Sequence, residues 1–124
     1  MNLREGTYHL VLRGLTPDAV PQSKLVRVAL EVTEVIERSG PETPHLVGEV
    51  VYLVYNHETI DRLLRDGFRV DKPYLHLDKD SLDSLIGRVV QVSSYVGTIK
   101  SGDGVGNAIV KHKFSPVTQV VSQR

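Results

Sequence analysis

The sequence predicts a mainly β domain with five strands and one helix between the third and fourth strands. The chain has 124 residues, of which 40% are hydrophobic and 24% charged, which suits a single domain over residues 1–124. Its apolar residues are mostly Val, Leu and Ile, and β-branched residues favour strands. Several stretches alternate apolar and polar residues, and clusters of Gly and Pro separate them. These observations together favour a sheet over a helical bundle.

The first half of the chain contains three predicted strands. Gly6 to Leu15 alternates, with Tyr8, Leu10 and Leu12 on one face. Lys24 to Glu37 has the clearest period of two, and its apolar face carries Val26, Val28, Leu30 and Val32. His45 to Asn56 is the third strand. Gly48 within it indicates a bulge or a sharp bend.

The pattern then changes to a helical period. In Glu58 to Arg65, apolar side chains fall on one helical face, with Asn56 or His57 as the N-cap. Asp80 to Ile86 is predicted to be one capped helical turn, with Asp80 or Ser81 as its cap. Two more strands follow, Arg88 to Thr98 and Asn107 to Pro116, joined by a glycine-rich loop.

This order of elements is that of an oligonucleotide-binding (OB) barrel, so the predicted fold is a five-stranded OB-like antiparallel barrel. Its binding face would lie on strands two and three, between the loops Leu15 to Ser23 and Lys100 to Gly106. The alternative architecture is an antiparallel sheet with a helix packed on one face.

Composition limits the classes of function. The 15 basic and 15 acidic residues give a net charge of zero, which argues against binding duplex DNA through bulk electrostatics. Cysteine is absent, so thiolate nucleophiles, thiolate metal sites and disulfides are excluded. The sequence shows no secretory signal and no apolar run of the ~20 residues that span a bilayer. We therefore expect a cytoplasmic protein without a membrane partner.

No residue pattern indicates catalysis. The five histidines lack metal-ligand spacing, and no nucleophile elbow surrounds a serine. Gly102 to Gly106 precedes a strand rather than a helix, which favours a hairpin tip over a phosphate loop. The aspartates near residue 80 are better explained as helix caps than as metal ligands. We expect no enzymatic activity, no metal and no cofactor.

The chain resembles single-stranded DNA-binding proteins with OB folds, particularly small phage-encoded ones. The resemblance is carried by Lys24-Leu-Val-Arg-Val-Ala-Leu-Glu-Val, by the helix around Ile60 to Leu64 and by Leu85-Ile-Gly-Arg-Val-Val-Gln-Val. The glycine-rich hairpin that leads to Asn107 and Phe114-Ser-Pro116 adds to it. The resemblance implies a protein that binds single-stranded DNA or RNA, with a role in DNA replication or repair.

The predicted nucleic-acid-binding residues are tyrosines and cations. Bases stack on aromatic rings, and cations neutralise phosphates. Lys111 and Lys113 share a strand face and lie about 7 Å apart along it. Tyr52 and Tyr55 are three residues apart, so they face opposite sides of the strand and only one of the two rings can be a stacking platform. The predicted set is Arg27, Tyr52, Tyr55, Arg88, Tyr95, Lys100, Lys111 and Lys113.

The alternation also assigns residues to the core. Phe114 alternates with Ala108 and Val110, which indicates a core position, and His112 is expected to face inward with them. The alternative explanation of the binding set is ordinary surface chemistry, with half-buried tyrosines and lysines that protect a sheet edge. In that case the protein is a structural or protein-interaction domain that forms a homo-oligomer through its sheet edge.

Overall fold

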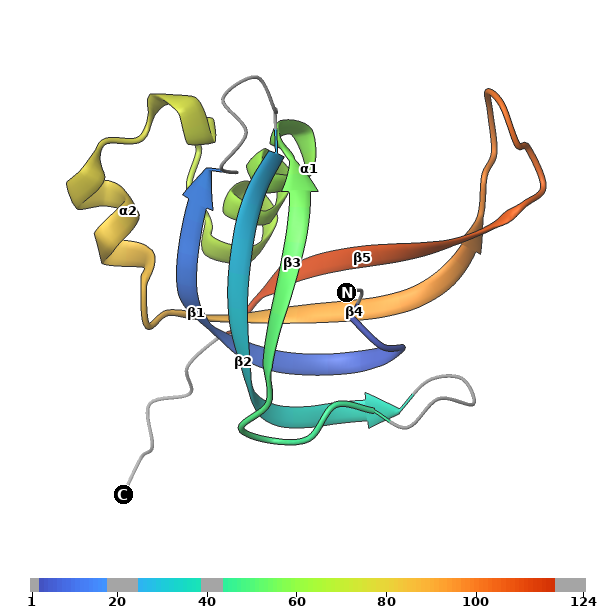
Figure 1. Ribbon diagram of the computed structural model, residues 1–124, viewed down its shortest axis with the longest axis horizontal. Helices are drawn as coiled ribbons and strands as arrows, with labels where there is room; N and C mark the ends of the chain where they lie inside the picture. The colour runs from blue at the N-terminus through green and yellow to red at the C-terminus, as the bar shows by residue number, and fades with distance from the viewer. Residues whose placement is uncertain (1–2, 18–24, 39–43, 118–124) are drawn as a thin grey trace.

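The structure, a computed structural model, is a bent antiparallel sheet with one helical segment against its concave side and a second helix beside β1 (Figure 1). It describes residues 3–17, 25–38 and 44–117. The strands are β1 (Gly6–Pro17), β2 (Leu25–Arg38), β3 (Val50–Asn56), β4 (Val89–Thr98) and β5 (Ala108–Pro116). The mainly β class and the five strands are thus confirmed.

The strand order is β3-β2-β1-β4-β5, and every neighbouring pair is antiparallel. The predicted closure into a barrel is wrong, because β3 and β5 are the two edges of one open sheet. In the described part of the chain, side-chain contacts and not a backbone ladder connect β3 to β5. The sheet is bent instead of closed, so that β1 to β3 run across the direction of β4 and β5 (Figure 1).

Bulges in β1 and β2 allow this bend. Their pairing shifts register at three places, between Thr7 and Tyr8, between His9 and Leu10, and between Leu12 and Gly14. Each extra residue increases the local twist and turns the strand. One half of β1 can therefore pair with β2 alone, while the other half also pairs with β4.

The connection between β3 and β4 contains more helix than the predicted helix and single helical turn. It comprises α1 (His57–Arg62), which continues as a π-helical turn η1 (Leu63–Gly67), then a 3₁₀ turn η2 (Tyr74–His76) and α2 (Lys79–Leu85). Asn56 caps α1 by accepting from the Thr59 amide at 2.8 Å, as predicted. The cap of α2 is Asp78, which accepts from the Ser81 amide at 2.8 Å, so the predicted cap at Asp80 or Ser81 is wrong.

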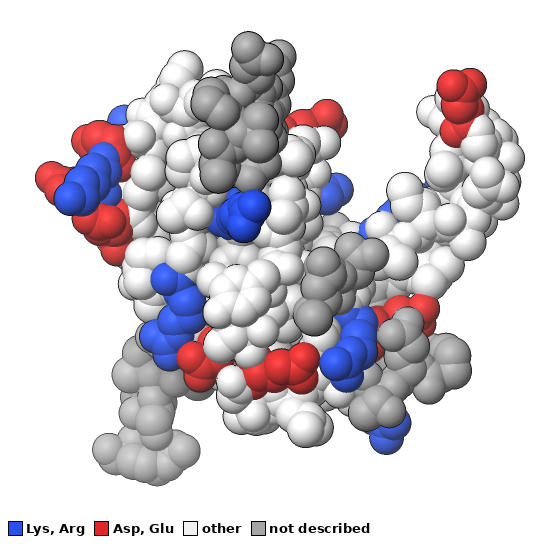
Figure 2. All heavy atoms as spheres, in the orientation of Figure 1, with Lys and Arg blue, Asp and Glu red and all other residues white. Residues whose placement is uncertain are grey.

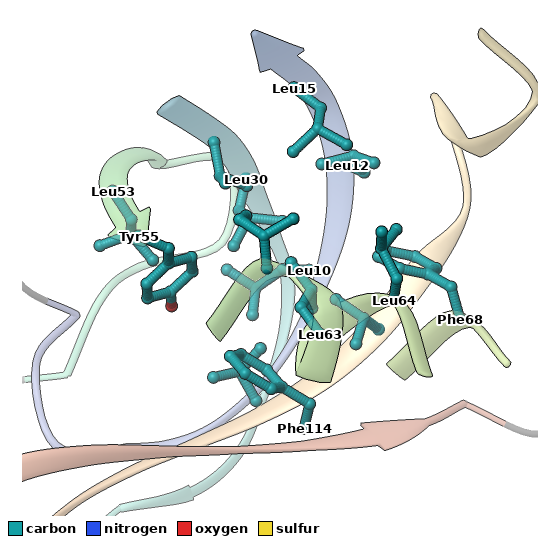
Figure 3. Packing of buried hydrophobic residues seen from close by; sticks show 14 of the residues in the cluster. Leu10, Leu12, Leu15, Leu30, Leu53, Tyr55, Leu63, Leu64, Phe68 and Phe114 are labelled. Atoms are coloured by element: carbon teal, nitrogen blue, oxygen red, sulfur yellow. The ribbon is translucent and has the colours of Figure 1, made fainter. Parts of the chain in front are cut away.

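The hydrophobic core lies between the concave face of the sheet and the α1–η1 segment (Figure 3). Tyr8, Leu10 and Leu12 of β1 are fully buried, which confirms that they share one face and shows that this face is turned inward. The α1–η1 segment covers them with Ile60, Leu63 and Leu64. Phe114 of β5 is buried beneath this segment, as its alternation predicted. The predicted apolar face of β2 is buried as well, with Val26, Val28, Leu30 and Val32.

Strand β3 begins at Val50 and not at His45, because a buried polar cluster holds residues 45–49 in a turn. The His45 ring is fully buried. Its Nε2 accepts from the Arg4 amide at 3.0 Å, so its Nδ1 carries the hydrogen and donates to Glu49 at 2.6 Å. This hydrogen bond is the main reason that the pKa of Glu49 is lowered. Gly48 has the left-handed φ of 92° that the turn requires.

Candidate nucleic-acid interface

The most prominent feature outside the core is the outer half of the β4–β5 hairpin, residues 95–111, which we call the arm. It projects from the body of the molecule and curves at its tip (Figure 1). No residue of the arm is buried. A continuous ladder supports it from the pair Tyr95↔Lys111 to the pair Thr98↔Ala108.

One face of the hairpin carries three of the predicted binding residues. Tyr95 lies directly opposite Lys111, and Lys113 lies opposite Ser93 on the same face. The Tyr95 side chain is 40% exposed. A Cβ added at Gly97 would lie 2.9 Å from Lys111 Cδ, so the aliphatic stem of Lys111 lies over this glycine and extends its ammonium group along the arm. An aromatic ring and two cations therefore lie on one ridge.

A hollow of ≈ 780 Å³ separates the arm from α1 and the end of β3. Figure 2 shows the space between the arm and the body. Five consecutive residues of β5 border it. Because successive side chains of a strand point to opposite faces, not all five can point into the hollow, so the backbone edge of β5 lines it as well. The lining residues are Tyr55, Thr59, Arg62, Tyr95, Ala108, Ile109, Val110, Lys111 and His112.

A side-chain bridge closes the inner end of the hollow. The Tyr55 hydroxyl in β3 and Nδ1 of His112 in β5 are hydrogen-bonded at 2.6 Å. The Tyr55 ring also meets the Phe114 ring edge-on at 5.8 Å, and Arg62 of α1 lies 5.3 Å from the centre of that ring. These contacts join the two sheet edges without a backbone ladder.

Burial controls the protonation of both bridge residues. Desolvation lowers the pKa of His112 to about 4, and the nearby Arg62 charge adds to this effect. Desolvation also raises the pKa of Tyr55 far above its ordinary value. At neutral pH both groups are therefore uncharged. The cations of the hollow are Arg62 and Lys111.

The remaining predicted residues lie elsewhere. Arg27 and Tyr52 are on the outer face of β2 and β3, where Tyr52 is 67% exposed and Tyr55 points inward, as their spacing predicted. Lys100 lies in the turn at the tip of the arm, and Arg88 lies before the other end of β4. The structure thus brings Tyr55, Tyr95 and Lys111 together around the hollow, but does not gather all eight residues in one groove.

Acidic side chains interrupt the outer face of β1 and β2. Glu31 is paired with Arg13 at 3.0 Å, and Glu34 lies 3.4 Å from His9. Figure 2 shows Lys and Arg side by side with Asp and Glu on this side of the molecule. Between residues 88 and 117, by contrast, Arg88, Lys100, Lys111 and Lys113 accompany a single acidic residue, Asp103. The hairpin is therefore the cationic part of a neutral chain.

Sequence reasoning missed two residues of the hollow, Thr59 and Arg62. They are three apart in α1, so they share one face of the helix, and this spacing is the only signal that the sequence offers. The sequence does not show that this face is turned toward the arm.

Comparison with known proteins assigns no family to the chain. No protein-family model matches it, and no curated protein and no solved structure matches it significantly. The described residues include no group of three or more His, Cys, Asp or Glu that could hold a metal ion. In the same part of the chain, no helix has the length and apolar character needed to cross a lipid bilayer.

Proposed function

We propose that the protein is a non-catalytic binder of single-stranded DNA or RNA, and that the strand lies along the arm and its hollow. The observation that carries this proposal is the cross-strand pair of Tyr95 and Lys111, which places an exposed ring beside a cation over a hollow that contains Arg62. Aromatic rings accept any base by stacking, and cations track the phosphates. Lys113 extends the same ridge toward the body of the sheet.

The strand order supports this proposal. The order β3-β2-β1-β4-β5, with α1 between β3 and β4, agrees with an OB-type arrangement in which the sheet is left open. OB folds bind single strands through a face framed by the β4–β5 loop. Arg27 and Tyr52 on the outside of β2 and β3 would then provide a second contact for a longer strand.

Fluorescence anisotropy with labelled oligo-dT and oligo-U at two salt concentrations tests the proposal. Replacing Tyr95 with Ala removes one stacking platform, so the affinity should fall by about 1–3 kcal/mol, or roughly 5- to 150-fold. Tyr95→Phe should bind almost as well as the wild type, because it keeps the ring. Equal affinity of Tyr95→Ala and the wild type would exclude this ring as a platform.

The salt dependence tests the cations separately. In the double variant Lys111→Ala/Lys113→Ala, two phosphate contacts are lost, and the slope of log K against log salt should become shallower by about 1.4. The matched control is Lys72→Ala/Lys79→Ala, which removes the same charge from the region of α2 and should leave the slope unchanged. Absence of any affinity at low salt would refute the proposed function.

The open sheet favours a second candidate function, a homo-oligomer formed through the sheet edges. Both β3 and β5 have an unpaired edge, and Val96, Ile109 and Val110 of the arm are each at least 42% exposed. Unpaired edges with exposed apolar residues are surfaces that can pair with another chain. Size-exclusion chromatography with light scattering separates the two candidates, since a tight oligomer without affinity for oligonucleotides supports only the second.

A further inference from the structure

A second hollow, of ≈ 440 Å³, lies at the end of β4 that is opposite to the arm. It is formed by the end of η1, the turn before β4, and the end of β5. Its lining residues are Gly67, Arg69, Gly87, Arg88, Val89, Pro116 and Val117. Along β5, Pro116 is five residues from Lys111, a separation of about 17 Å, so this hollow is distinct from the one beside the arm.

The charged lining of this hollow is entirely cationic among the residues that the structure describes. Arg69 is exposed and makes no ion pair with any described residue. The acidic residues nearest to it in the sequence are Asp66 and Asp71, and neither lines the hollow. Asp66 is already paired with Arg65 at 3.1 Å. A ligand would therefore meet uncompensated positive charge.

The backbone of Arg69 lies in the left-handed region. Arg69 has a φ of 59° and is the only described residue other than glycine with a positive φ. It ends the helical segment, because the Val70 amide turns back to the Leu64 carbonyl at 2.8 Å. Glycine is the usual residue at such a left-handed helix end, since other residues are strained there. Arginine at this position costs backbone energy, and strain of this kind is concentrated at functional sites.

The second arginine is held in place by its neighbours. Arg88 donates to the Phe68 carbonyl at 2.9 Å, and its guanidinium group lies 5.4 Å from the centre of the buried Phe68 ring. A guanidinium group has five N–H donors, so this single hydrogen bond leaves others for a ligand. The pre-set orientation reduces the entropy that Arg88 would lose on binding.

We infer that this hollow binds a phosphate group through Arg69 and Arg88. Two guanidinium groups match the geometry of phosphate oxygens, and the chemistry is the same for a phosphate monoester and for a phosphodiester. Gly87 faces open space, with no atom within 4 Å of the position of a Cβ, so the backbone can be approached closely there. The volume leaves room for the group that is esterified to the phosphate.

Thermal unfolding with sodium phosphate, against sodium chloride at the same ionic strength and pH, tests this inference. Phosphate at ten times its Kd should raise the Tm of the wild type by about 5 °C. In Arg69→Gly the rise should disappear, while the Tm without phosphate stays the same or increases, because glycine suits the left-handed backbone. The control Arg38→Gln removes one exposed cation at the end of β2 and should keep the rise.

Two results would overturn the inference: no phosphate-specific rise in the wild type, or an equal rise in Arg69→Gly. Oligo-dT with and without a 5′-phosphate then identifies the source of the phosphate group. A loss of affinity in Arg69→Gly for both oligonucleotides indicates a phosphodiester of the bound strand, and a loss only for the 5′-phosphorylated one indicates a terminal monoester. If only inorganic phosphate responds to Arg69→Gly, the site takes a small phosphate compound. The variant Lys111→Ala/Lys113→Ala should keep its response to phosphate even if the arm binds no nucleic acid.

Discussion

At the scale of single residues, the hydrogen bond between Tyr55 and His112 is the contact on which the hollow beside the arm depends. It connects the end of β3 to the base of the arm, where no backbone ladder joins the two strands. Both groups are at least partly removed from water, so the charge state of the imidazole matters for the stability of this contact. Burial and the nearby Arg62 both disfavour its protonated form. The neutral ring is therefore a condition of the native structure.

This condition predicts a specific dependence of stability on pH. The pKa of His112 is about 4 in the folded protein, against 6.5 for the model group. Between these values the unfolded chain binds a proton that the native state does not, so the free energy of unfolding falls as the pH falls from about 6.5 to about 4. The shift corresponds to at most about 3 kcal/mol. Urea denaturation at pH 4, 5, 6 and 7 should show this loss in the wild type and a shallower loss in His112→Asn.

The exposed His76 provides the control, because His76→Asn should leave the pH profile unchanged. Carboxylates such as Glu49, whose pKa is lowered, add their own loss of stability at lower pH, and this part is common to all three proteins. An identical profile in His112→Asn and the wild type would contradict the assignment.

At the scale of elements, η1 lies close against β4 at Gly67. A Cβ added at Gly67 would lie only 2.6 Å from Cγ2 of Val90 and 3.3 Å from Cδ1 of Leu63. Both neighbours belong to buried core residues, so neither can move freely. Glycine thus allows the helical segment to lie against the sheet and to cover Phe114.

Replacement of Gly67 by Ala should therefore destabilise the protein. Overpacking costs about 1–3 kcal/mol, and the better helix propensity of alanine offsets at most about 1 kcal/mol of this. Gly14→Ala in β1 is the matched control, since its Cβ would meet only the Ala29 Cβ, at an ordinary 3.6 Å. The midpoint of urea unfolding should fall for Gly67→Ala and stay constant or rise for Gly14→Ala. The reverse order would show that η1 can move away from β4.

The strands and their buried faces could be predicted from the sequence because a period of two is a local signal. Alternation placed Tyr8 and Leu10 on one face, Phe114 in the core, and Tyr52 and Tyr55 on opposite faces of β3. The start of β3 could not be predicted, because it depends on the contact of His45 with the amide of Arg4, 41 residues away. The open, bent sheet could not be predicted either, because the register shifts between β1 and β2 follow no local pattern.

The candidate site was predictable only in part, because only some of its contacts follow from local patterns in the sequence. The cross-strand pair of Tyr95 and Lys111 follows from a hairpin around the glycine-rich turn. The position of α1 relative to the arm, which adds Arg62 to the hollow, is a long-range result of packing. No local pattern in the sequence indicated the left-handed conformation of Arg69, since the residue at such a helix end is usually glycine.

At the scale of the whole molecule, the protein combines a packed body with an arm that adds nothing to the core. All residues from 95 to 111 are exposed or half-buried, and the residues of the core cluster lie outside this range. Burial of apolar surface is the main source of stability, so the arm has little effect on the free energy of unfolding. The arm is therefore not required for the core, which agrees with the proposal that it serves binding.

Removal of the arm separates these two roles. In the variant that replaces residues 96–110 by Asn-Gly, a two-residue type I′ turn joins Tyr95 directly to Lys111, which already face each other in the ladder. No buried residue is lost, so the free energy of unfolding should change by less than about 1 kcal/mol. The affinity for oligo-dT should nevertheless fall, because Lys100 and the part of the hollow formed by Ala108, Ile109 and Val110 are gone. A loss of cooperative unfolding would show that the arm belongs to the folding unit. Unchanged affinity would show that residues 96–110 make no contact with the nucleic acid and would limit the contact on the arm to Tyr95 and Lys111.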